Sequence, residues 1–181
     1  ASAAACVLAC IAAWGAGWLQ QPLPWLWAAG TAAWVIAGSW LLWRSVFVHE
    51  LPAPGLLGIA LAGLVVWTLS EYALHRFVFH GRSAPRLILQ GHGRHHGAPD
   101  VPLSMPFVAT LAQAAALWLL AALALGIPSG SLFSSAFFVG YGIYGAVHSL
   151  VHDLSRQGRV VRWLRDVHEV HHEHPGANFG V

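Results

Sequence analysis

Long apolar runs separated by short polar segments dominate this chain. No charged residue occurs from position 1 to 43 or from 101 to 152. Each of these stretches is long enough for two membrane crossings, since one helix needs about 20 apolar residues. We therefore predict an all-α, polytopic membrane bundle with four or five spans. The expected spans lie at roughly residues 3–19, 23–43, 55–74, 107–125 and 132–147.

The composition favours a membrane protein over a soluble domain. Of the 181 residues, 57% are hydrophobic and 9% are charged, whereas soluble domains carry about 25% charged residues. The apolar content excludes a disordered chain, and the few arginines argue against a nucleic-acid partner. Two cysteines, Cys6 and Cys10, cannot form a disulfide framework. The chain has no lysine, which excludes Schiff-base chemistry.

The arginines predict which way the chain faces. Eight of the nine lie in two segments, at residues 76–94 and 156–165. The apolar hairpin between these segments crosses twice and returns the chain to the same side. The positive-inside rule makes that side cytoplasmic. Arg44 is the exception, because it falls on the opposite face.

Ten of the twelve histidines form four clusters in or beside these polar segments. They are His75, His80, His92, His95, His96, His148, His152, His168, His171 and His172. Residues three and four apart share a helix face, so the rings of each HxxHH cluster can converge. The five-residue step from His75 to His80 differs, because it turns by about 140° on a regular helix. We predict a helix end or a π-type irregularity there.

This pattern indicates a metal site. Buried imidazoles need partners, and imidazole is a ligand for Zn, Cu, Fe and Ni. One ion takes about three or four histidines, so ten indicate two ions. A proton-relay or pH-sensing histidine network is the alternative. His49 and His174 are expected to be loop residues.

Nearby acids are expected to hold the second nitrogen of bound imidazoles. Asp153 and Glu169 are the preferred candidates, because one follows His152 directly and the other lies inside the last cluster. The other acids considered are Glu71, Asp100 and Asp166. Carboxylate-bridged di-iron bundles carry a Glu-x-x-His motif on each of two helices, and this pair of motifs is missing from the sequence. An iron site here would therefore be formed entirely, or almost entirely, by histidine.

These motifs resemble the fatty acid hydroxylase / sterol desaturase superfamily of integral-membrane, non-haem di-iron enzymes. Residues 75–99 are most similar to its fatty acid 2-hydroxylase branch, with bacterial β-carotene hydroxylases as the nearest rival. The matching motifs are Glu71-Tyr72-x-x-His75-Arg76-Phe77-x-Phe79-His80, His92-x-x-His95-His96-x-x-Pro99-Asp100, His148-x-x-x-His152, and His168-x-x-His171-His172 followed by Asn178-Phe179-Gly180-Val181.

The resemblance implies that the ten histidines bind two iron ions, which zinc could replace in purified protein. It implies O2, a long-chain lipid substrate such as a fatty acyl chain or sterol, and hydroxylation or desaturation as the reaction. Electrons would come from a separate ferredoxin or cytochrome b5-type protein. We expect one domain, 1–181, in which 55–181 form the histidine-box core and 1–54 add spans. The expected location is a bacterial inner membrane, with the site facing the cytoplasm.

Other functions stay open. A carotenoid ring hydroxylase is the enzymatic alternative. A membrane metal transporter or sensor would need histidines along its spans, whereas here they gather at one membrane face. A metal-stabilised structural protein would bind the ions without turnover. A hydrolase is disfavoured because the Gly-x-Ser-x-Gly motif is missing. Gly140, Gly142 and Gly145 would permit either a close helix contact or a lipid tunnel.

Overall fold

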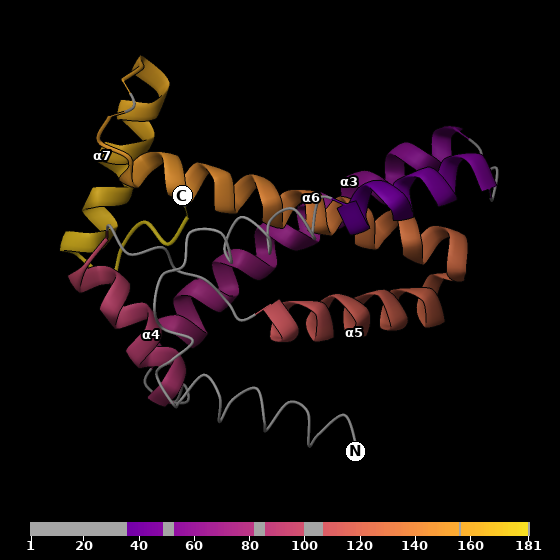
Figure 1. The fold of residues 1–181 in the computed structure, drawn as a ribbon, viewed down its shortest axis with the longest axis horizontal. Helices are drawn as coiled ribbons and strands as arrows, with labels where there is room; N and C mark the ends of the chain where they lie inside the picture. The colour runs from indigo at the N-terminus through magenta and orange to yellow at the C-terminus, as the bar shows by residue number, and fades with distance from the viewer. Residues whose placement is uncertain (1–35, 49–52, 82–85, 100–106, 156, 181) are drawn as a thin grey trace. The chain divides into compact units, whose positions relative to one another are not determined.

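The computed structural model describes residues 36–48, 53–81, 86–99, 107–155 and 157–180. Every regular element in these ranges is helical (Figure 1), which confirms the all-α prediction for this part of the chain. The elements are the π-helix η2 (Arg44–Val48), α3 (Ala53–Ala73), the π-helix η3 (Leu74–Phe79), α4 (Arg86–Gly97), α5 (Phe107–Leu125), α6 (Ile127–His152) and α7 (Arg159–Glu173).

Two helical stretches are long and apolar enough to cross a membrane, namely Pro54–Phe79 and Ile127–His152. They contain the spans expected at 55–74 and 132–147. Ile36–Val48 and Leu111–Leu125 are shorter apolar helices. The expected span 3–19 and most of 23–43 lie outside the described residues, so two of the four or five expected spans are matched by helices of sufficient length.

The exposed surface of α3 has the character of a lipid-facing helix. Leu57, Leu61, Val65 and Leu69 are each more than half exposed. A helix that is apolar on all sides is typical either of a buried core or of a membrane span. Because these side chains are exposed, the second description fits α3.

The chain divides into two compact units, and α3 and α6 contribute residues to both. The first unit comprises residues 1–67 and 104–142, and the second comprises 68–103 and 143–181. In the first unit, small residues let the helices approach closely. A Cβ atom added to Gly63 of α3 would lie 2.5 Å from the carbonyl oxygen of Phe133 in α6.

The glycines of α6 have different surroundings. A Cβ atom on Gly140 would lie 2.5 Å from Cδ1 of Trp67, so this glycine serves the close helix contact. The Trp67 ring also packs edge-on against Tyr141, with the ring centroids 5.0 Å apart. Gly142 and Gly145 have no neighbouring atom within 4 Å of an added Cβ, so they leave open space beside the helix.

In the second unit, α3 ends at Ala73 and continues directly as η3. The backbone N–H of His80 donates to the carbonyl oxygen of His75 at 3.1 Å. This five-residue hydrogen bond is the π-helical one, and it confirms the irregularity predicted between these two histidines. The π-helical turn brings His75 and His80 to the same side of the chain.

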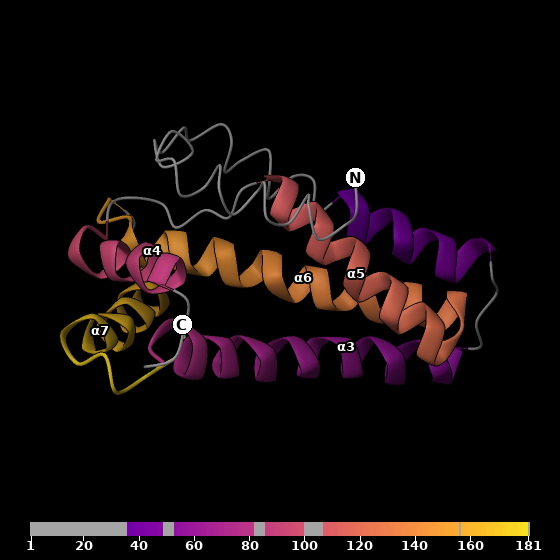
Figure 2. The ribbon, with the colours of Figure 1, turned by 90° about the horizontal axis from the view of Figure 1, so that it is seen from below.

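Helix α7 crosses the C-terminal end of α6, as Figures 1 and 2 show from two directions. Arg165 joins the two helices. Its guanidinium donates to the carbonyl oxygens of Val151 at 2.9 Å and Asp153 at 2.8 Å. The last carbonyls of a helix have no partner within it, so this cation satisfies the end of α6. Helix α4 lies beside α7 in both views.

Candidate metal centre

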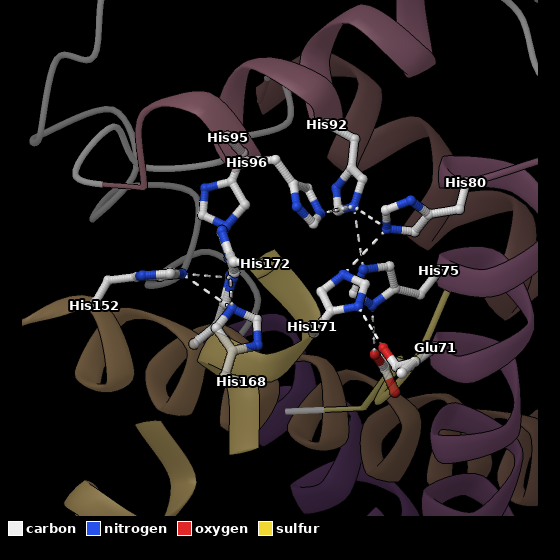
Figure 3. Close-up of polar contacts among 12 residues, drawn as sticks. Glu71, His75, His80, His92, His95, His96, His152, His168, His171 and His172 are labelled. Atoms are coloured by element: carbon white, nitrogen blue, oxygen red, sulfur yellow. Dashed lines mark hydrogen bonds and ion pairs between the residues drawn. The ribbon is translucent and has the colours of Figure 1, made fainter. Parts of the chain in front are cut away.

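All ten clustered histidines lie in the second unit, and they form two groups of five. Within each group, the nearest ring nitrogens all lie within 4.8 Å of one another. Figure 3 shows the rings turned inward from several helices. We call the groups site A and site B. Site A consists of His75, His80, His92, His96 and His171, and site B of His95, His148, His152, His168 and His172.

Each HxxHH cluster contributes to both sites, which the sequence spacing did not predict. In α4, His92 and His96 belong to site A and the middle histidine, His95, belongs to site B. In α7 the middle histidine is His171, and it belongs to site A. At 100° per residue, adjacent histidines point 100° apart on a helix. The three rings of a cluster therefore fan out over two neighbouring sites.

The rings meet through the same atom, Nε2. In site A, the Nε2 atom of His92 lies 2.8 Å from that of His80 and 3.1 Å from that of His96. In site B, the Nε2 atoms of His95 and His148 are 3.0 Å apart. The Nε2 atoms of all ten rings take part in such contacts, at 2.8–3.3 Å.

Burial favours the neutral form of several of these rings. Burial, followed by the effect of neighbouring imidazoles, lowers the pKa of His92 and His168 from 6.5 to about 2. The same causes lower the pKa of His80, His96 and His172 to about 4. A neutral ring has one protonated nitrogen and one lone pair, so each of these rings can bind a cation.

The outer nitrogen of His171 shows which tautomer this ring adopts. Its Nδ1 atom lies 2.8 Å from the carbonyl oxygen of Ala177. A carbonyl oxygen can only accept, so Nδ1 carries the proton and donates it. The Nε2 lone pair of His171 therefore points into site A. This arrangement is the usual one for a metal-binding histidine.

Glu71 lies against a ring of site A. Its Oε1 atom lies 3.5 Å from Nδ1 of His75, and both side chains are largely buried. Asp153 accepts hydrogen bonds from the backbone N–H and hydroxyl of Ser155. Glu169 is exposed on α7. In the sequence, Glu71 was one of several candidates and was not preferred, and its position one helical turn before His75 is the signal that could have distinguished it.

Two aromatic residues border the sites and were not singled out from the sequence. The Phe179 ring lies beside site A, with its centroid 5.6 Å from the rings of both His80 and His171. The Tyr144 ring stacks on His148 of site B at 5.5 Å. Phe179 belongs to the Asn-Phe-Gly motif that follows the last histidine cluster. Its spacing from that cluster was the available signal.

The remaining expected residues lie apart from both sites or outside the described ranges. His174 follows α7 and is exposed, as expected for a loop residue. Asp166 is exposed on α7. His49 and Asp100 lie outside the described residues.

The donor set of each site fits a transition-metal ion. Five imidazoles whose Nε2 atoms converge on one point offer a set of nitrogen ligands for one shared cation. An all-imidazole set suits iron, zinc, copper or nickel, whereas magnesium and calcium prefer oxygen ligands. The buried Nδ1 atoms of His92, His96 and His168 have no hydrogen-bond partner. In these rings it is Nε2 that faces the other imidazoles of the site.

The comparisons with known proteins agree with this geometry. The fatty acid hydroxylase family model matches residues 60–181, which include all ten histidines. The chain is 32% identical to dihydroceramide fatty acyl 2-hydroxylase FAH1 of Arabidopsis thaliana, over 81% of this chain and 64% of that protein. It is 30% identical to the fatty acid 2-hydroxylase of Rattus norvegicus, over 72% of this chain and 38% of that protein.

A solved structure has the same fold. It is described as full-length Scs7p in which only the hydroxylase domain is visible. It matches with a TM-score of 0.74 at 25% identity, over 86% of this chain and 61% of that one. The chain thus spans less than two thirds of the length of each of these three proteins. The matches confirm the resemblance drawn from the histidine motifs.

Proposed function

Because the chain belongs to the fatty acid hydroxylase family, we propose that it hydroxylates a long-chain fatty acyl lipid at the carbon next to the carbonyl. The observation that carries this proposal is the pair of five-histidine sites, with every Nε2 atom turned inward. The substrate class and the position of the hydroxylated carbon are proposed from the names of the relatives. Two of them are a dihydroceramide fatty acyl 2-hydroxylase and a fatty acid 2-hydroxylase.

We assign one iron ion to site A and one to site B. When bound, these ions would supply the O2 chemistry that cleaves an unactivated C–H bond. Acid–base side chains alone cannot cleave such a bond. The ten histidines would be the ligands. Glu71 and the Ala177 carbonyl would orient His75 and His171, and we keep Asp153 and Glu169 as orienting candidates to be tested beside them.

The reaction balance requires an outside electron source. Insertion of one oxygen atom of O2 into a C–H bond consumes two electrons and two protons and releases water. We propose a ferredoxin or cytochrome b5-type protein as the donor. The histidine ligands are neither oxidised nor reduced in this balance, so both electrons come from the partner.

The apolar helices would bring the lipid to the sites. His75 and His80 lie at the C-terminal end of the stretch Pro54–Phe79, and His148 and His152 at the end of Ile127–His152. We propose that these stretches span the bilayer and that both sites lie at its cytoplasmic surface, on the side of the arginine-rich segments. The open space beside Gly145, one turn before His148, would admit the acyl chain.

Lipid mass spectrometry tests the reaction. Cells that produce the chain with an electron donor should accumulate acyl lipids heavier by 16 Da, with fragment ions that place the hydroxyl at the second carbon. The His171→Ala variant should form none. A loss of 2 Da would indicate desaturation, and a gain of 16 Da in carotenoids alone would indicate a ring hydroxylase. Either result would contradict the proposal, as would a metal-loaded chain that leaves all lipids unchanged.

A further inference from the structure

Helix α7 presents three different faces, and one of them is apolar and uncovered. The buried face carries His168 and His171. The second face is exposed and charged. It consists of Arg159, Arg162, Asp166, Glu169 and Glu173. On the third face, Val160, Trp163 and Val170 are 67%, 62% and 41% exposed. We call this third set the apolar face.

The helix is attached directly to the end of a membrane-spanning stretch. That stretch ends at His152, and Arg165 in the middle of α7 bonds to the carbonyl oxygens of Val151 and Asp153. The middle of α7 therefore lies at the depth where the stretch leaves the membrane. Leu154, in the short connection, is 72% exposed and continues the apolar surface.

The direction of α7 agrees with a position along the membrane surface. In Figures 1 and 2 it runs across the end of α6 instead of continuing it. If α6 spans the bilayer, a helix that crosses its end lies in the plane of the interface. Amphipathic helices in this plane place tryptophan and aliphatic side chains among the acyl chains, with arginines at the headgroups.

We propose that α7 lies in the membrane–water interface, with the apolar face in lipid and with Arg159 and Arg162 at anionic headgroups. The helix that supplies His168, His171 and His172 would thereby be held at a constant depth, next to the acyl chains. The size of the apolar face argues against a protein partner. Three side chains are far too few for a stable interface, which buries about 800 Å² on each partner.

The proposal rests on the membrane spans of the proposed function and does not depend on the reaction. It can be tested with nitroxide spin labels on single cysteines, in a Cys6→Ala, Cys10→Ala background. The metal-loaded chain would be placed in nanodiscs that contain anionic phospholipid. The test positions are Val160→Cys, Trp163→Cys and Val170→Cys. Matched controls on the charged face of the same helix are Arg162→Cys, Asp166→Cys and Glu173→Cys.

Power saturation then compares collisions with oxygen, which concentrates in lipid, and with a water-soluble nickel chelate. We expect the oxygen-to-nickel ratio to be several-fold higher at the three apolar positions than at the three charged ones. Retained metal content in each variant shows that it is folded. A label at Leu61→Cys in α3 should also give the high ratio.

Three results would overturn the proposal. Equal ratios on the apolar and charged faces would show that α7 is surrounded by water. Labels on the apolar face that meet neither oxygen nor nickel would show that protein covers it, such as a second copy of the chain. A water-like ratio at Leu61→Cys would remove the spans on which the proposal rests. In contrast, absence of hydroxylated lipid alongside the expected ratios would contradict only the proposed reaction.

Discussion

The Nδ1 atom of His171 and the carbonyl oxygen of Ala177 are 2.8 Å apart, so the backbone just after α7 sets the tautomer of a histidine in site A. The turn that delivers this carbonyl contains Asn178, whose φ of 48° is left-handed. Its side-chain Nδ2 atom donates to the carbonyl oxygen of Val167 in α7 at 3.3 Å. The segment after α7 is therefore folded back along the helix that it orients.

The effect of replacing Asn178 on site A should depend on how readily the new residue adopts a positive φ. Asn178→Val places a β-branched residue at positive φ, which costs about 1–2 kcal/mol, and should weaken metal binding at site A. Asn178→Gly adopts this conformation without strain and should retain more metal. Both variants lose the hydrogen bond to Val167, so the difference between them reports the backbone strain at position 178 alone. Thermal unfolding and metal content per chain measure the two effects, and equal behaviour of the variants would contradict the prediction.

The orienting role of Glu71 can be separated from that of other acids. Glu71→Gln removes the charge beside Nδ1 of His75 and should lower metal affinity by about 10–100-fold, as the loss of such partners typically does. Glu169→Gln changes an exposed acid on α7 and is the matched control, expected to keep full affinity. Competition with a chelator measures the affinities. An equal loss in both variants would instead support the expectation that Glu169 orients a ligand.

The division of the histidines predicts different outcomes for two double variants that remove the same number of ligands. His92→Ala with His171→Ala takes both from site A, so one ion should leave readily and the other should stay bound. His95→Ala with His171→Ala takes one from each site, so both ions should be weakened, each with four ligands left. Metal content per chain during dialysis against a chelator distinguishes these outcomes. Identical release from both variants would show that the two groups do not act as separate sites.

Close packing in the first unit predicts a contrast between two glycines of α3. Gly63→Ala would place a methyl group against the Phe133 carbonyl and the Ala136 side chain, at 2.5 and 2.9 Å. Such overpacking costs about 1–3 kcal/mol. Gly58→Ala meets nothing within 4 Å and should be neutral or gain up to about 1 kcal/mol from helix propensity. Unfolding temperatures in one detergent compare them, and an equal change in both would contradict the contact.

Spacing along the chain accounts for the features that the sequence predicted correctly. The charge-free stretches predicted apolar helices, and α3, α5 and α6 occupy three of the expected ranges. The five-residue step from His75 to His80 predicted the π-helical turn. These features depend on neighbours within about one helical turn, where the residue spacing determines the geometry. Clustering along the chain also singled out the ten histidines that the structure groups together, and their role as metal ligands stays a prediction.

Tertiary structure decided which side chains meet. Spacing allowed His95 to share a site with His92, but the fold places His95 among the rings of site B. Packing also placed Glu71 and the Ala177 carbonyl beside two of the rings, while the orienting roles expected of Asp153 and Glu169 stay predictions. The sequence by itself determined the helices and the set of imidazoles. Their division into two groups required the fold, because it depends on the relative rotation of helices that are distant in the chain.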